Sequence, residues 1–224
     1  MFVPTTPSEQ ILFTTVRIEA KTASGISRVG TGFFFDFTMQ NSQGRLPLII
    51  TNNHIVENTV EGQFQFHEGD GTGEEQKPSG KFFSVALDDF GKRWVRHPNP
   101  NIDLCAMPYN PLLEEARSQE KTVFRKSLEN KLVQTNSELE DLGAVEDILM
   151  VGYPIGLWDT ANNLPIIRKG ITASHPSVDY CGQSMGVVDV ACFPGSSGSP
   201  IMIVNESSYK KSRTQQLWEL ECCF

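Results

Sequence analysis

Residues 193–200 read Phe-Pro-Gly-Ser-Ser-Gly-Ser-Pro, and this stretch decides how the rest of the chain is interpreted. It places Ser197 close to two glycines, just before an apolar run at 201–204. Glycine lets the backbone turn sharply, so that successive N–H groups can point at one spot. A serine hydroxyl becomes a useful nucleophile only where a base takes its proton and donors stabilise the oxyanion. The stretch is therefore informative only together with a histidine and a carboxylate.

Two upstream stretches supply these groups. Residues 48–56 form an apolar, β-branched run, and His54 lies near its end, where a strand would open into a loop. In residues 99–107, Asp103 lies between a Pro/Asn turn and an apolar, strand-like stretch. Taken singly, His54 would be interpreted as a structural histidine and Asp103 as a turn or cap residue. The order His54, Asp103, Ser197 matches the chymotrypsin-type triad and differs from the subtilisin and α/β-hydrolase orders. Taken jointly, the three residues are predicted to be a catalytic triad.

These motifs resemble those of HtrA-like members of the trypsin-like, chymotrypsin-fold serine peptidases. The matching segments are T-N-N-H-I-V at 51–56, I-D-L-C-A-M at 102–107 and P-G-S-S-G-S-P-I at 194–201. V-G-Y-P-I-G at 151–156 and K-G-I-T-A-S at 169–174 are similar to two further landmarks of the family. The chain looks most like the single-domain, intracellular bacterial members. Five motifs in the same order are far more specific than any one of them.

The resemblance implies a serine endopeptidase that acts on polypeptides. His54 would be the general base and Asp103 its orienting carboxylate, and the N–H groups of Gly195 and Ser197 would form the oxyanion hole. No metal or organic cofactor is implied. By the family pattern, Ala191 lies at the base of the primary specificity pocket. Because Ala191 is not acidic, a small or medium apolar side chain is expected there rather than Lys or Arg.

Length and composition agree with a protein of this kind. A chain of 224 residues, rich in short apolar runs separated by Gly and Pro, is typical of one all-β domain. The net charge of −8 argues against a nucleic-acid or anionic-membrane surface. No secretory signal or membrane-length apolar run is evident. The five cysteines are an odd set without metal-ligand spacing, so reduced thiols in the cytoplasm are expected. The oligomeric state stays open.

The expected architecture is a single all-β domain spanning 1–224, with two six-stranded-type antiparallel β-barrels of the chymotrypsin kind. We expect the first barrel at about 8–110 and the second at about 143–205. Between them, at about 111–142, the apolar residues have helix-like spacing among charged residues and predict one or two short helices. The helix-like positions are Val123, Phe124, Leu128 and Leu132, preceded by Leu112, Leu113 and Ala116.

The tail at 206–224 departs from the family pattern. Relatives carry more chain after the serine motif, including a glycine-containing strand that lines the cleft, whereas no glycine follows Gly198 here. The sequence therefore predicts that the last strands of the second barrel are missing or altered, which would expose a sheet edge and weaken the pocket wall. This leaves a non-catalytic or regulatory binding module with a protease fold as the alternative function. An esterase-like activity is a third reading, disfavoured by the motifs.

The other three histidines are weaker candidates for the base. His67 lies in a polar, glycine-rich stretch, His97 precedes a proline and His175 lies in a Ser/Pro turn. His97 is near Asp103 in sequence but lacks a strand to position it. All three are predicted to be surface residues.

Overall fold

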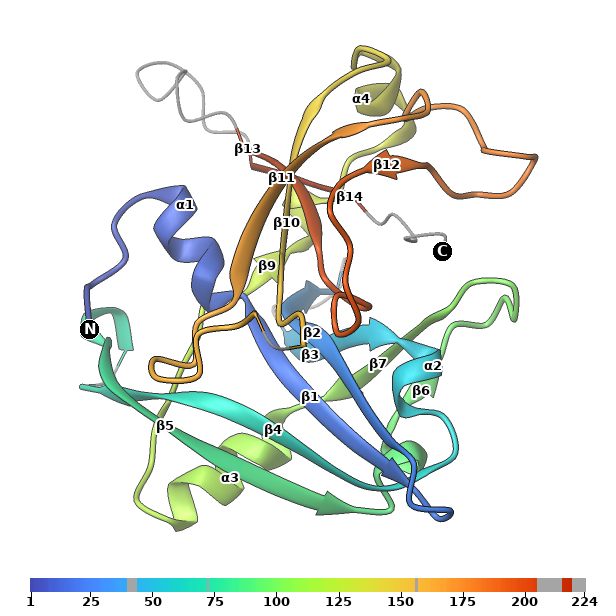
Figure 1. Cartoon of the computed structure of the whole chain (residues 1–224). Coiled ribbons are helices and arrows are strands. Elements are labelled where there is room, and N and C mark those ends of the chain that lie inside the picture. The colour runs from blue at the N-terminus through green and yellow to red at the C-terminus, as the bar shows by residue number, and fades with distance from the viewer. Residues whose placement is uncertain (40–43, 72, 156, 205–214, 219–224) are drawn as a thin grey trace.

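The computed structural model describes residues 1–39, 44–71, 73–155, 157–204 and 215–218 (Figure 1). The described chain consists of a nine-stranded sheet and a five-stranded sheet, each built mainly from antiparallel pairs. Helices are few and short. This confirms the predicted all-β class with two β-barrels, although the two sheets are unequal rather than both six-stranded.

The first sheet forms the lower half of the molecule in Figure 1 and has the strand order β5-β4-β1-β2-β3-β7-β6. Its strands are β1 (Thr15–Thr22), β2 (Ser27–Thr38), β3 (Arg45–Asn52), β4 (Thr59–Asp70), β5 (Lys77–Asp88), β6 (Val95–Arg96) and β7 (Leu104–Pro108). The β1–β2 turn is closed by a 2.9 Å hydrogen bond from Gly25 N–H to the Thr22 carbonyl. Gly25 has a φ of 85°, a conformation that glycine adopts without steric cost.

Three consecutive phenylalanines on β2 explain how the two halves share one strand. Side chains alternate between the faces of a strand. Phe34 accordingly packs into the core of the first barrel, whereas Phe33 and Phe35 face the opposite side. There they meet Val151 and Met202 of the second barrel in a separate apolar cluster. Strand β2 is therefore the common wall against which the second barrel docks.

The second sheet lies above the first in Figure 1 and has the order β12-β11-β10-β13-β14. Its strands are β10 (Asp147–Gly152), β11 (Ile166–Thr172), β12 (Val188–Asp189), β13 (Ile201–Val204) and β14 (Gln215–Trp218). The central strands β10 and β13 contribute the buried residues Ile148, Met150, Ile201 and Ile203, which form the core of this barrel. Strand β13 is the apolar run predicted directly after the serine motif.

Strand β14 corrects one prediction about the tail. The sequence indicated no strand of the expected kind after residue 205, yet β14 pairs antiparallel with β13 over four residue pairs, from Val204 with Gln215 to Ile201 with Trp218. Pairing depends on backbone hydrogen bonds, which most side-chain compositions tolerate on an edge strand. The rest of the tail lies outside the described residues.

The connection between the barrels is only partly helical. It contains the predicted helices, α3 (Asn110–Ser118) and α4 (Asn136–Glu140). However, β8 (Val123–Phe124) pairs with β4, and β9 (Leu128–Glu129) pairs in parallel with β2. The helix predicted from these apolar residues was therefore wrong, because their helix-like spacing also suits two short strand segments that extend the first sheet.

The remaining helical elements are single turns: α1 (Pro7–Gln10), α2 (Asn53–Val56), and the 3-10 turns η1 (Ile11–Phe13), η2 (Gly73–Glu75), η3 (Phe90–Arg93) and η4 (Asn130–Leu132). Of these, α2 matters most for function, because it directly follows β3 and contains His54. Within the described segments, no helix has the length and apolar composition required to cross a bilayer.

Candidate active site

His54 lies in α2, at the point where strand β3 ends. Its ring Nδ1 is hydrogen-bonded to Asp103 Oδ2, and its backbone N–H donates to Asp103 Oδ1 over 2.9 Å. Both oxygens of one carboxylate are thus engaged by one histidine. Because the carboxylate binds at Nδ1, the proton is favoured there and Nε2 is left as the basic nitrogen. The imidazole is half exposed to solvent.

Asp103 is held by its backbone as well as by its side chain. It lies in the loop between β6 and β7, and its carbonyl accepts hydrogen bonds from Asn53 N–H at 3.1 Å and from Asn52 Nδ2 at 2.8 Å. The end of β3 and the start of α2 therefore fix the aspartate and the histidine together.

Ser197 lies between β12 and β13, flanked by two glycines whose backbones have positive φ. Gly195 has a φ of 91° and Gly198 a φ of 79°. A Cβ atom at Gly198 would overlap the carbonyl oxygen of Thr31, and one at Gly195 would lie 2.6 Å from the carbonyl oxygen of Tyr153. Both positions thus require glycine for conformation and for space. The sharp turn predicted for this stretch is present.

Asn52 connects the serine loop with the histidine and the aspartate. Its Nδ2 donates to the Asp103 carbonyl, and its Oδ1 accepts a hydrogen bond from Gly198 N–H. One side chain thus joins the three motif segments, although they are far apart in sequence. Among the described residues, Ser197 Oγ makes no hydrogen bond to His54. Such catalytic hydrogen bonds often form only once substrate is bound.

Two backbone donors in the serine loop have no partner within the described residues: the N–H groups of Gly195 and Ser197. The preceding carbonyl, of Pro194, accepts a 2.7 Å hydrogen bond from Ile155 N–H. In a trans peptide the C=O and the N–H point in opposite directions. The Gly195 N–H, which belongs to the same peptide unit, therefore points away from Ile155.

Thr31, on β2 of the first barrel, is a site residue that sequence reasoning missed. It is fully buried, and its N–H donates to the Ser197 carbonyl at 2.9 Å. Its Oγ1 donates to the Gly195 carbonyl at 3.0 Å and accepts from Tyr153 N–H at 2.9 Å. Asn52 was also missed. The sequence offered no signal for either role, because both act through partners distant along the chain.

Ala191 is exposed and lies in the segment after β12. Its carbonyl accepts a 2.9 Å hydrogen bond from Nη1 of Arg168, a buried arginine on β11 that sequence reasoning did not single out.

One of the predictions about the other histidines was wrong. His67 lies on β4 and is only 4% exposed, packed edge-on against Phe13. Strand β4 continues through the glycine-rich stretch and pairs with β8 at His67 and Glu68. Burial lowers the pKa of His67 to about 4, so the ring is neutral at pH 7. His97 is exposed as predicted, and His175 is partly buried. Within the described residues, no cluster of His, Cys, Asp and Glu suits a metal ion.

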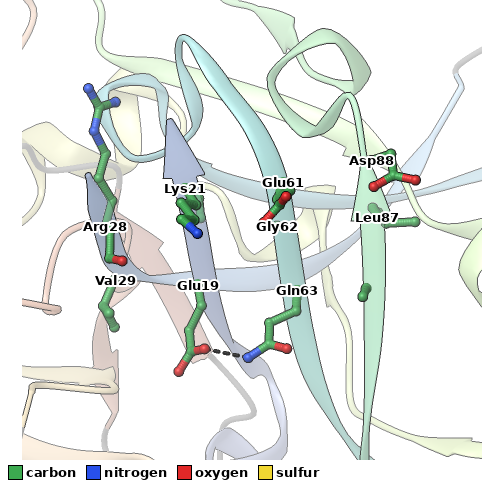
Figure 2. Close-up of a pocket in the computed structure, with 12 residues that line it drawn as sticks. Glu19, Lys21, Arg28, Val29, Glu61, Gly62, Gln63, Leu87 and Asp88 are labelled. Atoms are coloured by element: carbon green, nitrogen blue, oxygen red, sulfur yellow. Dashed lines mark hydrogen bonds between the residues drawn. The ribbon is translucent and has the colours of Figure 1, made fainter. Parts of the chain in front are cut away.

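The surface of the described residues includes a smaller and a larger hollow that bear on function. The smaller, of about 240 Å³, is next to Asp103 and has walls from both barrels, with Asn99, Asn101, Ile102 and Leu104 facing Gln183, Ser184 and Met185. The larger, of about 590 Å³, lies on the first sheet across β1, β2, β4 and β5 (Figure 2). Its walls carry both charges, with Glu19, Glu61 and Asp88 beside Lys21 and Arg28. The Glu19 carboxylate is hydrogen-bonded to Gln63 there.

Solved structures resemble this chain at low sequence identity. The chain is similar in structure to the HtrA-type protease AlgW with tripeptide (TM-score 0.47, 13% identity, 87% of this chain and 48% of that chain). It is also similar to the Rv3671c protease from M. tuberculosis in its active form (TM-score 0.44, 14% identity, 85% of this chain and 65% of that chain). The chain thus spans about half to two thirds of the length of these structures. No curated protein sequence matches it.

The family comparison covers most of the chain. The family described as trypsin-like peptidase domain matches residues 30–206. That interval begins just before Thr31 and includes the segments that carry the histidine, the aspartate and the serine. The chain therefore belongs to the trypsin-like peptidase domain family.

Proposed function

We propose that this protein is a serine endopeptidase that hydrolyses peptide bonds through His54, Asp103 and Ser197. The observation that carries the proposal is the double engagement of the Asp103 carboxylate by His54, with Asn52 linking that pair to the serine loop. A histidine oriented in this way can take a proton at Nε2 and return it in the next step.

In the proposed reaction, Ser197 Oγ attacks the scissile carbonyl carbon while its proton passes to Nε2 of His54. The C–N bond then breaks, the amine leaves with that proton, and an acyl ester remains on Ser197. Water repeats the sequence: it loses a proton to His54 and releases the acid and the serine. Asp103 stabilises the imidazolium in both halves. The N–H groups of Gly195 and Ser197 bind the negative oxygen, and each such donor is worth roughly 3 kcal/mol in the transition state.

The substrate is proposed to be a polypeptide that crosses the hollow beside Asp103. The walls of this hollow combine apolar side chains (Ile102, Leu104, Met185) with amides (Asn99, Gln183), and this combination suits an extended peptide. For the residue before the scissile bond, a small or medium apolar side chain remains the proposal, with Ala191 at the base of its pocket. A panel of peptides varied at that position tests it, and a strict preference for Lys or Arg would contradict it.

A reducing, cytoplasmic location is also proposed. Cys105 is a buried free thiol on β7, and Cys181 is a free thiol exposed to solvent. Burial raises the pKa of Cys105 to about 12, so this thiol stays protonated and unreactive at neutral pH. Unaltered activity in millimolar reductant would agree with this location, whereas loss of activity would contradict it.

The proposed function is tested by labelling purified protein with a fluorophosphonate, which reacts only with an activated serine. Wild type should be labelled, and Ser197→Ala and His54→Ala should not. Ser199→Ala, two residues beyond the nucleophile, is the matched control and should still be labelled. Absence of labelling in folded wild type would contradict the proposal. It would favour the alternative of a binding module, for which the charged hollow on the first sheet is the site to examine.

A further inference from the structure

Arg168 is a charged residue in the wall of the second barrel. It lies on β11 opposite Met150 of β10, and only 8% of it is exposed. Its neighbour Lys169 points to the other face, where it is exposed and pairs with Asp147 at 2.7 Å. Removing a guanidinium from water is costly, and arginine is rarely buried unless its donors are engaged. The groups that accept from Arg168 therefore indicate its role.

One nitrogen of Arg168 is hydrogen-bonded to two residues of the segment that leads to the proposed nucleophile. Nη1 donates to Ser196 Oγ at 2.6 Å and to the Ala191 carbonyl at 2.9 Å. Ser196 is 2% exposed, so its hydroxyl is shielded from water. A hydrogen bond from a charged donor in such a place is stronger than a neutral one. Strand β11 is thereby connected directly to the residue that precedes Ser197.

The hydroxyl of Ser196 also closes the turn that contains Gly195. It accepts a hydrogen bond from Phe193 N–H at 3.1 Å, while Ser196 N–H donates to the Phe193 carbonyl at 2.9 Å. These two bonds hold residues 193–196 in one conformation. That conformation sets the directions of the N–H groups of Gly195 and Ser197. Arg168 contacts this turn through the same oxygen that closes it.

We propose that Arg168 is a positioning residue for the oxyanion donors of Gly195 and Ser197. The inference rests on the proposed function and deepens it. Arg168 does not touch the substrate; it fixes the Ser196 hydroxyl and the Ala191 carbonyl, and through them the turn. Nη1 carries two hydrogens, one for each of these acceptors.

The test compares three variants in the intact chain. Arg168→Met keeps an unbranched side chain but removes the donors, and Ser196→Ala removes only the accepting hydroxyl. Lys169→Met, on the same strand, is the matched control. The measured quantity is the second-order rate constant of fluorophosphonate labelling. We expect Arg168→Met and Ser196→Ala each to reduce it by about 100-fold, the effect of losing one oxyanion donor, with Lys169→Met within about twofold of wild type.

Two further readouts separate positioning from a merely structural role. With an activated ester, kcat should fall in Arg168→Met while KM stays within about twofold, because the donors act on the transition state. The double variant Arg168→Met/Ser196→Ala should be no slower than the slower single variant, because both act on one turn. In Arg168→Ala, added methylguanidinium should restore part of the labelling rate.

Each outcome decides the matter. Labelling of folded Arg168→Met at the rate of Lys169→Met would overturn the inference, as would additive effects in the double variant. Should Arg168→Met fail to fold, Ser196→Ala still tests the same contact: an unchanged labelling rate in that variant overturns the proposal. Absence of labelling in wild type would instead overturn the proposed function and this inference with it. Labelling in wild type but equally in Ser196→Ala would overturn this inference alone.

Discussion

The backbone N–H of Thr31 donates a 2.9 Å hydrogen bond to the carbonyl of Ser197. The first residue lies on β2 in the wall of the first barrel, and the second lies in the serine loop of the other barrel. Because Thr31 is fully buried, this bond is shielded from water and fixes the serine backbone against the barrel that carries His54 and Asp103. The geometry of the candidate active site thus depends on how the two barrels dock.

Replacing Thr31 by valine removes a hydroxyl that serves two partners, the Gly195 carbonyl and the Tyr153 N–H. Leaving buried polar groups without partners costs about 1–3 kcal/mol, so we expect a loss of this size in the free energy of unfolding. Urea denaturation measures it. Thr31→Ser keeps the hydroxyl and is the control; equal stability of the two variants would contradict the prediction.

Asn52→Ala should impair labelling of Ser197 more than it impairs folding. The substitution removes the contacts to the Asp103 carbonyl and to Gly198 N–H, which together align the serine loop with the His54–Asp103 pair. We expect a reduction of about tenfold or more in the labelling rate, as for other losses of catalytic alignment. Asn53→Ala is the control, since among the described residues that side chain is hydrogen-bonded to Glu57 alone. An equal effect of both changes would exclude a specific role for Asn52.

Asp103→Asn tests the orientation of the histidine. An amide in this place can present an N–H to Nδ1 of His54, which favours the tautomer with its proton on Nε2 and so removes the base. In the serine-protease triad this change lowers kcat by about 10⁴-fold, and we expect a similar loss in ester hydrolysis here. Circular dichroism should show an unaltered fold. Retention of more than a tenth of the wild-type rate would argue against the assigned triad.

Acid should weaken the fold through His67. Its pKa is lowered from 6.5 to about 4 by burial, so between these values the unfolded chain binds a proton that the folded chain does not. The contribution of His67 to stability is complete above pH 6.5 and is lost as the pH falls through 4. It amounts to about 3 kcal/mol for a shift of this size. The His67→Phe variant has no ionisable group at this position, so its stability lacks this pH-dependent contribution.

Urea denaturation of wild type and His67→Phe at pH 7, 5.5 and 4.5 measures that contribution. The difference in unfolding free energy between the two proteins should shift in favour of the variant as the pH falls. Taking the difference between the unfolding free energies of the two proteins cancels the effect of the carboxylates, which titrate in both. A difference independent of pH would contradict the lowered pKa.

Gly198→Ala should be far more damaging than Gly25→Ala, although both glycines have positive φ. At Gly25 a Cβ would meet no atom within 4 Å, so only backbone strain of about 1 kcal/mol is expected. At Gly198 it would overlap the Thr31 carbonyl, adding a steric cost for a total of about 3 kcal/mol. Thermal unfolding of the two variants compares them, and similar midpoints would contradict the prediction.

Several features of the fold followed directly from local sequence. The short apolar runs separated by Gly and Pro, and the apolar run after the serine motif, act over a few residues, so the sequence predicted the all-β class and strand β13. The helix predicted at 123–132 was wrong because that prediction also relied on local spacing alone. Its apolar residues suit a helix or two short strands equally well, and only the neighbouring strands β4 and β2 select the latter.

The candidate site residues were also proposed from the sequence: the order His54, Asp103, Ser197 and the glycines around the serine are visible without a structure. What only the tertiary structure decided is how these groups are held. The contacts of Thr31 and Asn52 with the serine loop and the burial of Arg168 beneath it join residues from different strands and barrels. Local propensities act over a few neighbouring residues, whereas these hydrogen bonds exist only once the two sheets have packed and excluded water.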